Sequence, residues 1–143
     1  MPAEEDRSRA VHVTLDDSTL LRVHDALERL LDAEPDVGIR DRILLDTAVA
    51  EIAGNVLRHG ETATEIVIDG QVLDDRIVVE LTDDGSAVRI DLDAARAAPM
   101  PDDLVESGRG LSIAFAALDD LRYERVGPRN RWHLVRYRGA RGS

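Results

Sequence analysis

Apolar residues follow a period of two in some segments of the chain and a helical period in others. Residues 10–15 alternate between apolar and polar side chains, so we expect a short strand there. A helical pattern follows and is closed by Glu34-Pro35. Its apolar face consists of Leu20, Val23, Leu27, Leu30 and Leu31. Polar residues 16–18 precede this helix and offer side chains for its N-cap.

A second, longer helical pattern covers residues 39–59. Its buried side is expected to consist of Leu45, Ala48 or Val49, Ile52 and Val56. Gly60 follows directly, at the C′ position where glycine commonly ends a helix. The pattern therefore predicts one long helix with a clear end.

The middle of the chain predicts a β-hairpin followed by a long loop. Residues 66–68 and 76–82 have the pattern of strands, and a polar turn through residues 70–75 lies between them. Residues 86–107 contain two prolines and no sustained period. A segment of this length without a period is unusual inside a compact domain and is typical of a lid or binding loop.

The last part of the chain predicts one helix and a second hairpin. The helix begins near Arg109, with Leu111, Phe115, Leu118 and Leu121 facing inward. Residues 121–126 and 131–137 then pair around a turn at residues 127–130. We therefore expect an α+β fold, a two-layer sandwich in which a mixed, mostly antiparallel sheet is covered on one face by about three helices.

Length and composition bound the kind of protein. The 143 residues are enough for one domain with a hydrophobic core, so we expect a single domain over residues 1–143 with an ordered core at about 10–138. No apolar run reaches the ~20 residues that cross a bilayer. The N-terminus lacks the pattern of a secretory signal, and the chain has no cysteine. We expect a cytoplasmic protein that does not contact a membrane.

The charge indicates what the chain binds. A net charge of −11 disfavours direct binding to nucleic acid, and aromatic residues, at 3%, are too few for stacking on bases. A protein or a metal-complexed small molecule is the expected partner. All 18 basic residues are arginine, which excludes a P-loop lysine or a Schiff-base lysine. The remaining histidines, His12, His24 and His133, fit no metal-ligand spacing, and Trp132 and Phe115 are expected in the core.

Three short polar motifs carry the candidate chemistry. The first is the stripe of Glu51, Asn55 and His59, spaced four residues apart on one side of the long helix. A carboxylate and a carboxamide one turn apart can together accept a proton and bind a hard cation. Taken alone, the stripe is better explained as a solvated helix face, although asparagine inside a helix costs propensity.

The other two motifs contain glycine. Asp83-Asp84-Gly85 ends a strand, where a carboxylate can accept a hydrogen bond from an exocyclic amine while the backbone approaches a flat ring. Ordinary turn chemistry is the alternative explanation. Gly108 and Gly110 open a helix, whose free amides and positive dipole end form an anion site. A flexible hinge capped by Ser107 is the alternative.

The order and spacing of these motifs resemble the GHKL, or Bergerat-fold, ATP-binding superfamily. Residues 51–60, 83–85 and 108–111 look like its N, G1 and G2 boxes. Within it, the chain is most similar to the RsbW-like family of anti-sigma factors and serine-protein kinases. The similarity covers residues 10–138, including the short N-terminal strand and helix and the final hairpin.

The resemblance implies ATP or ADP with Mg²⁺ as cofactors. Asn55 would bind the Mg²⁺ that bridges the triphosphate, and Asp83 would bond the adenine amino group. Gly85 would let the backbone approach the base. Backbone amides of the G2 box would cradle the phosphates, at Gly108, Arg109, Gly110 and Leu111.

Two departures from the family pattern stand out. Ser86-Ala87-Val88 follows Gly85, where the family often has a second glycine or a Pro-Phe pair. The G2 box has two glycines only, with Arg109 between them. Both departures bear on lid geometry, and so on turnover, more than on nucleotide binding.

By this resemblance the chain is an ATP-dependent serine-protein kinase and anti-sigma factor. It would phosphorylate a STAS-type anti-anti-sigma protein, with Glu51 as the general base for the serine hydroxyl, and would sequester a sigma factor. The alternative is a non-catalytic nucleotide-binding module that regulates a partner by contact alone. We do not expect the catalytic domain of a sensor histidine kinase, because the chain has no room for a phosphoacceptor hairpin. Many members of the family dimerise, so we expect a homodimer.

Overall fold

The computed structural model describes residues 10–59, 62–88 and 106–138, with the backbone alone at 59 and 106–110. The strands are β1 (Val11–Thr14), β2 (Glu65–Val72), β3 (Arg76–Asp83), β4 (Asp120–Val126) and β5 (Arg129–Tyr137). The helices are α2 (Thr19–Asp32), α3 (Ile39–His59) and α5 (Glu106–Ala117). The strands form one five-stranded sheet in the order β1-β2-β3-β5-β4, and each neighbouring pair is antiparallel.

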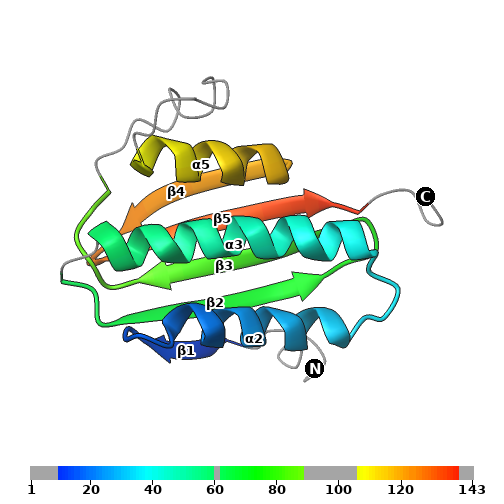
Figure 1. The fold of residues 1–143 in the computed structure, drawn as a ribbon, viewed down its shortest axis with the longest axis horizontal. Coiled ribbons are helices and arrows are strands. Elements are labelled where there is room, and N and C mark those ends of the chain that lie inside the picture. The colour runs from blue at the N-terminus through cyan, green and yellow to red at the C-terminus, as the bar shows by residue number, and fades with distance from the viewer. Residues whose placement is uncertain (1–9, 60–61, 89–105, 139–143) are drawn as a thin grey trace.

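The three described helices cover one face of this sheet (Figure 1). α2 packs over β1 and β2, α3 lies over the middle strands, and α5 packs against both α3 and β4. β3 shows the reason, because Ile77, Val79 and Leu81 alternate with half-buried residues and are at most 1% exposed. The α+β two-layer fold expected from the sequence is confirmed, with every described strand pair antiparallel.

The predicted buried face of α3 is also confirmed. Leu45, Ala48, Val49, Ile52 and Val56 are all buried in the core cluster. In α2, the inward positions Val23, Leu27 and Leu31 are buried, but Leu20 is 45% exposed, so its place on the apolar face is wrong. Leu20 lies in the first turn of the helix.

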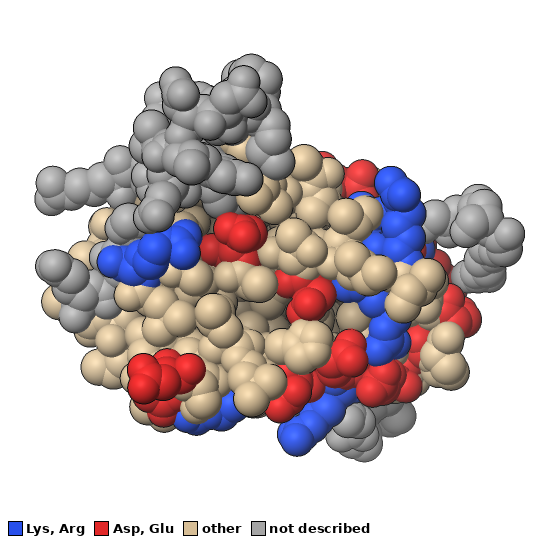
Figure 2. Space-filling view, in the orientation of Figure 1, with Lys and Arg blue, Asp and Glu red and all other residues tan. Residues whose placement is uncertain are grey.

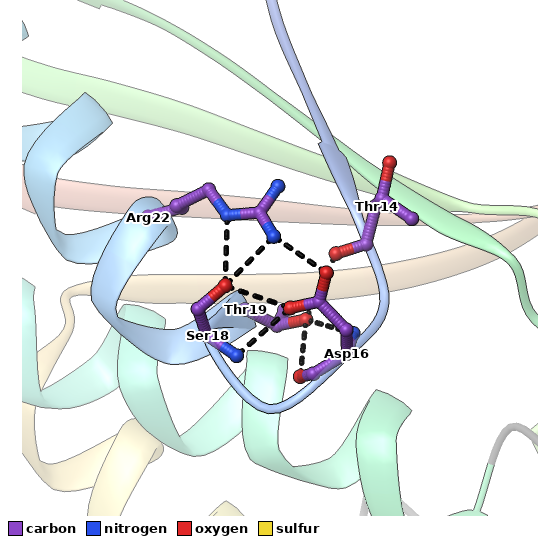
Figure 3. Close-up of polar contacts among 5 residues, drawn as sticks. All are labelled: Thr14, Asp16, Ser18, Thr19 and Arg22. Carbon is purple, nitrogen blue, oxygen red and sulfur yellow. Dashed lines mark hydrogen bonds and ion pairs between the residues drawn. The ribbon is translucent and has the colours of Figure 1, made fainter.

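The start of α2 is built differently from the expected N-cap. Ser18 holds the N-cap position but makes no capping bond with its side chain. Its hydroxyl donates to Asp16 Oδ1 at 2.8 Å and accepts from the Arg22 guanidinium, while Asp16 also accepts from Arg22 (Figure 3). Thr19 donates to the Thr14 carbonyl at 2.9 Å and so ties the helix to the end of β1. Hydrogen bonds from the Ser18 hydroxyl, then from the Ser18 backbone N–H and from Arg22, lower the pKa of the Asp16 carboxyl.

β2 is longer than the sequence pattern predicts, because Gly70 belongs to the strand. A Cβ on Gly70 would lie 2.6 Å from Leu30 Cδ2 and 2.9 Å from the Val78 carbonyl oxygen. Glycine is therefore favoured here by the close approach of the Val78 backbone on β3, with the end of the Leu30 side chain of α2 packed above it. The turn that joins β2 to β3 is accordingly shorter than residues 70–75.

The final hairpin has a two-residue turn in place of the predicted four. Gly127 has φ +58° and is followed by Pro128, an arrangement that glycine permits at the first turn position. Residue 129 already belongs to β5. Leu121, which the sequence pattern places both on the inward face of the helix and at the start of the hairpin, lies in β4. Asn130, expected in the turn, is thus a strand residue.

A buried ion pair joins the two layers. Arg136 on β5 donates from Nε to Asp41 Oδ1 on α3 at 2.7 Å, and its Nη1 donates to the Ala117 carbonyl at 2.9 Å. The two charged side chains are 15% and 11% exposed. In the part of the chain that the structure describes, no helix is long and apolar enough to cross a membrane.

Candidate functional site

The three polar motifs converge at one end of the molecule. The C-terminal end of α3, the end of β3 and the start of α5 lie at the left of Figure 1. This arrangement follows from topology, because α3 runs toward that end, β3 finishes there and α5 begins there. The sheet thus brings together segments that are far apart in the sequence.

Asn55 is a buried polar residue near the end of α3. Its side chain is 5% exposed, and Oδ1 accepts a hydrogen bond from Arg58 Nη2 at 2.7 Å. Its Nδ2 is buried and has no hydrogen-bond partner among the residues that the structure describes. A buried donor without a partner costs roughly 1–3 kcal/mol, so the fold holds a polar group that a ligand could satisfy.

Glu51 lies one turn before Asn55 on α3 and is half-buried. The helical spacing places the two residues on one side of the helix, as the sequence predicts. The backbone of His59 completes the last turn, and its side chain falls outside the described part. Because Glu51 and Asn55 lie one helical turn apart on the same side of α3, both side chains could contribute to one site.

Asp83 ends β3 with a side chain that is 3% exposed. Its Oδ1 accepts hydrogen bonds from the backbone N–H of Gly85 at 2.8 Å and from Asn130 Nδ2 at 2.9 Å. Gly85 is itself packed closely, since a Cβ there would lie 3.0 Å from both Ala63 Cβ and Asp83 Oδ1. A side chain at this position would therefore make tight contacts with both neighbours.

Asp84, the middle residue of the motif, has a structural role. Its carboxylate accepts bonds from the Thr64 N–H at 2.8 Å, the Thr64 hydroxyl at 2.5 Å and the Glu65 N–H at 3.2 Å. Burial raises the pKa of Asp84, but the bonds from Thr64 and Glu65 outweigh it, and the pKa lies below its ordinary value. Asp84 thus anchors the segment before β2 and leaves Asp83 to face the site.

Three residues of the final hairpin that belong to no sequence motif also lie at the site. Asn130 contacts Asp83, Tyr123 donates to Asn130 Oδ1 at 2.5 Å, and Arg125 donates to the Gly85 carbonyl at 2.6 Å. The sequence could have indicated Asn130 as a polar residue on the helix-covered face of the last strand. The composition of residues 127–130 predicts a turn instead, so Asn130 is not recognised as a strand residue. Asn130 is 2% exposed and lies opposite Asp83 in the β3–β5 register.

The G2 residues lie in the first turns of α5, which begins at Glu106, earlier than predicted. Residues 106–109 therefore supply the free backbone N–H groups that a helix start leaves without helical partners. Gly110 follows them along the helix, and Leu111 has a side chain that is 0% exposed, in the core. Because the helix begins at Glu106, the backbone N–H groups of Gly110 and Leu111, which the sequence predicts as phosphate contacts, are not among the free donors of the helix start. Residues 89–105 of the predicted loop lie outside the described residues.

The side chains at the site and on the surrounding surface restrict the kind of metal ion that the site could bind. On the visible part of the helix side, arginine side chains form separate patches next to acidic ones (Figure 2). Among the described residues, no group of three or more His, Cys, Asp or Glu could hold a metal ion. One amide oxygen suits Mg²⁺ that keeps waters and phosphate oxygens as its other ligands. Asn55 could offer that oxygen once Arg58 turns away from it.

The uncovered face of the sheet has two shallow depressions. One, of about 330 Å³, is lined by Glu80, Arg122, Tyr123, Glu124, Arg131 and His133. The other, of about 200 Å³, is lined by Asp69, Gly70, Gln71, Val78 and Glu80. Cross-strand ion pairs such as His133–Glu80 at 3.0 Å occupy this face, and none of the predicted nucleotide residues lines either depression. His12, His24 and His133 lie at or near the surface, as predicted.

Comparison with known proteins agrees with the geometry. The family model for the histidine kinase-like ATPase domain matches residues 7–135. A search of the curated proteins finds no match. The RsbU and RsbW domains of Rv1364c from Mycobacterium tuberculosis match with a TM-score of 0.61 and 20% identity over 93% of this chain and 34% of that chain. The histidine kinase AdeS of Acinetobacter baumannii matches with a TM-score of 0.50 and 16% identity over 97% of this chain and 73% of that one.

The chain spans about a third of the length of the Mycobacterium tuberculosis chain. At identities of 16% to 20%, the two structures share the fold with this chain, and the fold alone is taken from them. The family model carries the membership, since it covers most of the chain. The chain therefore belongs to the histidine kinase-like ATPase domain family, within the GHKL superfamily of ATP-binding folds.

Proposed function

We propose that the chain binds ATP or ADP with Mg²⁺ where α3, β3 and α5 meet. The observation that carries the proposal is the buried Asp83 carboxylate, whose Oδ1 accepts from two N–H donors beside Gly85, where a Cβ would approach two neighbouring atoms to 3.0 Å. Oδ2 of the same carboxylate then accepts the amino group of the base. The family is one of nucleotide-binding domains, which agrees with this assignment.

Asn55 and the start of α5 bind the triphosphate in this proposal. Asn55 contributes one oxygen ligand to the ion, and its unpartnered Nδ2 donates to a phosphate oxygen. The free N–H groups at the start of α5, those of Gly108 and Arg109 in the G2 box among them, and the positive end of the helix dipole hold the phosphates. Mg²⁺ held by Asn55 would neutralise phosphate charge, while the chain's own residues position the nucleotide.

We further propose that the activity is serine-protein phosphorylation of a STAS-type anti-anti-sigma protein, combined with sequestration of a sigma factor. Glu51, half-buried one turn from Asn55, accepts the proton of the serine hydroxyl as it attacks the γ-phosphate. The likeness to a protein with RsbU and RsbW domains supports a partner-protein role. A homodimer is proposed as well.

The second candidate is a nucleotide-binding module without turnover. Arg58 favours it, because its guanidinium bonds Asn55 Oδ1 at 2.7 Å and so occupies the oxygen proposed for the metal. In a kinase, Arg58 turns away when Mg²⁺ and nucleotide bind. In a non-catalytic module, it stays, and the nucleotide binds with little dependence on Mg²⁺.

Phosphotransfer distinguishes the two candidates. Purified protein is incubated with radiolabelled Mg-ATP and a purified STAS-domain protein encoded in the same genome, and label on serine is measured. The kinase proposal predicts label that Glu51→Gln removes while ADP affinity changes less than about threefold. Asp46→Asn, a carboxylate on the same helix that pairs with His24 at 2.8 Å, is the matched control and keeps the label. Full transfer by Glu51→Gln would refute the base assignment, and nucleotide binding with no transfer in the wild type would favour the module.

Oligomeric state is tested separately by light scattering coupled to gel filtration. A homodimer doubles the 15.7 kDa mass of the chain. A monomer mass at all concentrations, with and without nucleotide, would contradict the dimer.

A further inference from the structure

One polar network, marked by no sequence motif, surrounds Asp83. Asn130 on β5 lies directly opposite Asp83 in the strand register and is 2% exposed. Its Nδ2 donates to Asp83 Oδ1 at 2.9 Å and to the Ser86 carbonyl at 2.8 Å. Its Oδ1 accepts from the Tyr123 hydroxyl at 2.5 Å and from Arg125 Nη1 at 3.1 Å. A carboxamide has two donor hydrogens and two acceptor lone pairs, so Asn130 uses its full hydrogen-bonding capacity.

The direction of this network is fixed by Arg125. A guanidinium only donates, so the Asn130 atom that faces Arg125 is the oxygen and the atom that faces Asp83 is the nitrogen. Tyr123 agrees with this direction, because its hydroxyl accepts the Val88 N–H at 2.9 Å and keeps its own hydrogen for Asn130. A flipped carboxamide would place donor against donor at Arg125 and acceptor against acceptor at Asp83.

The fixed direction determines what Asp83 can recognise. Asp83 Oδ1 receives N–H groups from Gly85 and Asn130, which together hold the carboxylate in one rotation. Oδ2 remains as the acceptor for a ligand. A base with an amino group at C6 offers a hydrogen to that oxygen, whereas a base with a carbonyl at C6 offers a second acceptor. Two buried acceptors facing each other are unfavourable.

We infer that Asn130 is a positioning residue that orients Asp83 and so sets a preference for 6-aminopurine over 6-oxopurine nucleotides. Tyr123 and Arg125 hold its carboxamide in the required direction. This inference rests on the proposed nucleotide site and adds to it a residue outside the three motifs. It predicts that base preference depends on the final hairpin as well as on the end of β3.

The test compares ATP with inosine triphosphate, which differs at C6, by isothermal titration calorimetry on the whole chain with Mg²⁺. The wild type is expected to prefer ATP. Asn130→Asp places a carboxylate oxygen against Asp83 Oδ1, so one of the two carboxyl groups must take up a proton. ATP affinity is then expected to fall about tenfold or more, and the preference for ATP to fall by a similar factor. His133→Gln, on the opposite face of the same strand, is the matched control and keeps both affinities.

A second variant covers the case in which Asn130→Asp does not fold. Replacing Tyr123 by Phe and Arg125 by Met removes both donors to Asn130 Oδ1 and frees the carboxamide to flip, so the ATP preference is expected to fall several-fold. Equal loss of affinity for both nucleotides, with the preference unchanged, would mean that Asn130 is only structural and would overturn the inference. A wild type that binds neither nucleotide would overturn the proposed site itself, and the positioning role with it.

Discussion

Gly85→Ala tests the close packing around Asp83. The new Cβ would lie 3.0 Å from Ala63 Cβ and 3.0 Å from Asp83 Oδ1. Carbon atoms prefer a separation of about 3.5–4.0 Å, so the backbone at residue 85 or its neighbours must move by roughly 0.5 Å. The Gly85 N–H bond to Asp83, now 2.8 Å, would then lengthen beyond the normal range. A weakened bond to a buried carboxylate is worth about 1–2 kcal/mol, which is roughly a 5- to 30-fold loss of nucleotide affinity.

Two other glycines supply matched controls for this prediction. In Gly70→Ala the Cβ would lie 2.6 Å from Leu30 Cδ2 and 2.9 Å from a backbone oxygen, far from the site. It should lower the free energy of unfolding by about 1–3 kcal/mol and leave nucleotide affinity unchanged. In Gly38→Ala the nearest atom lies 3.9 Å away, so nucleotide affinity should not change, and any loss of stability should be limited to the N-cap preference for glycine over alanine at the start of α3.

The assays are calorimetric titration with ADP and urea unfolding, both performed on the three variants and the wild type. The reasoning is refuted if Gly85→Ala binds ADP as the wild type does, or if Gly70→Ala loses as much nucleotide affinity as Gly85→Ala. Either result would separate the packing of Gly85 from nucleotide recognition.

Three further predictions concern the fold. Arg136→Met should lower the free energy of unfolding by about 3 kcal/mol in urea titrations, because it leaves the Asp41 carboxylate without its ion-pair partner from β5; an unchanged midpoint would contradict this. His24→Gln should destabilise more at about pH 5 than at about pH 8. The hydrogen bond that the His24 ring donates to Asp46, and then the charge of Asp46, raise the pKa of His24. Its contribution is therefore present below the unfolded pKa and is lost as pH rises through the folded one; a loss independent of pH would count against it. Ile52→Ala, at a residue that is 0% exposed, should cost about 2–5 kcal/mol by thermal or urea unfolding, and a loss below 1 kcal/mol would show that the core collapses around the cavity.

The helical part of the fold could be predicted because periodicity is a local property. α3 begins at Ile39 and ends at His59, as predicted, since a long apolar stripe and a following glycine mark its length and its end. The exposed Leu20 was misplaced because apolar spacing alone does not show that the core begins further along the helix.

The strand boundaries were less predictable because tertiary contacts decide them. Gly70 reads as a turn residue, yet it lies in β2, where the Val78 backbone and the end of the Leu30 side chain leave little space for a side chain. A sequence pattern shows only which side chains are present. It does not show that residue 70 must lack a side chain because atoms from other elements approach it closely.

The candidate site divides in the same way. Glu51 and Asn55 could be found from spacing, and Asp83 and Gly85 from their place at a strand end. Asn130 could not be found, because its bond to Asp83 joins residues 47 positions apart through strand register. Register is set by the turn and by which side chains face the core, and the turn was predicted two residues too long.

The central claim is that nucleotide binds where α3, β3 and α5 meet, and its most direct test is an NMR titration of ¹⁵N-labelled protein with Mg-ADP. The account predicts saturable shifts at the backbone amides of Asn55, of residues 83–85 and of residues 108–111, with little change on the uncovered face of the sheet. Shifts confined to residues such as Glu80 and His133, or no shifts at millimolar nucleotide, would contradict it.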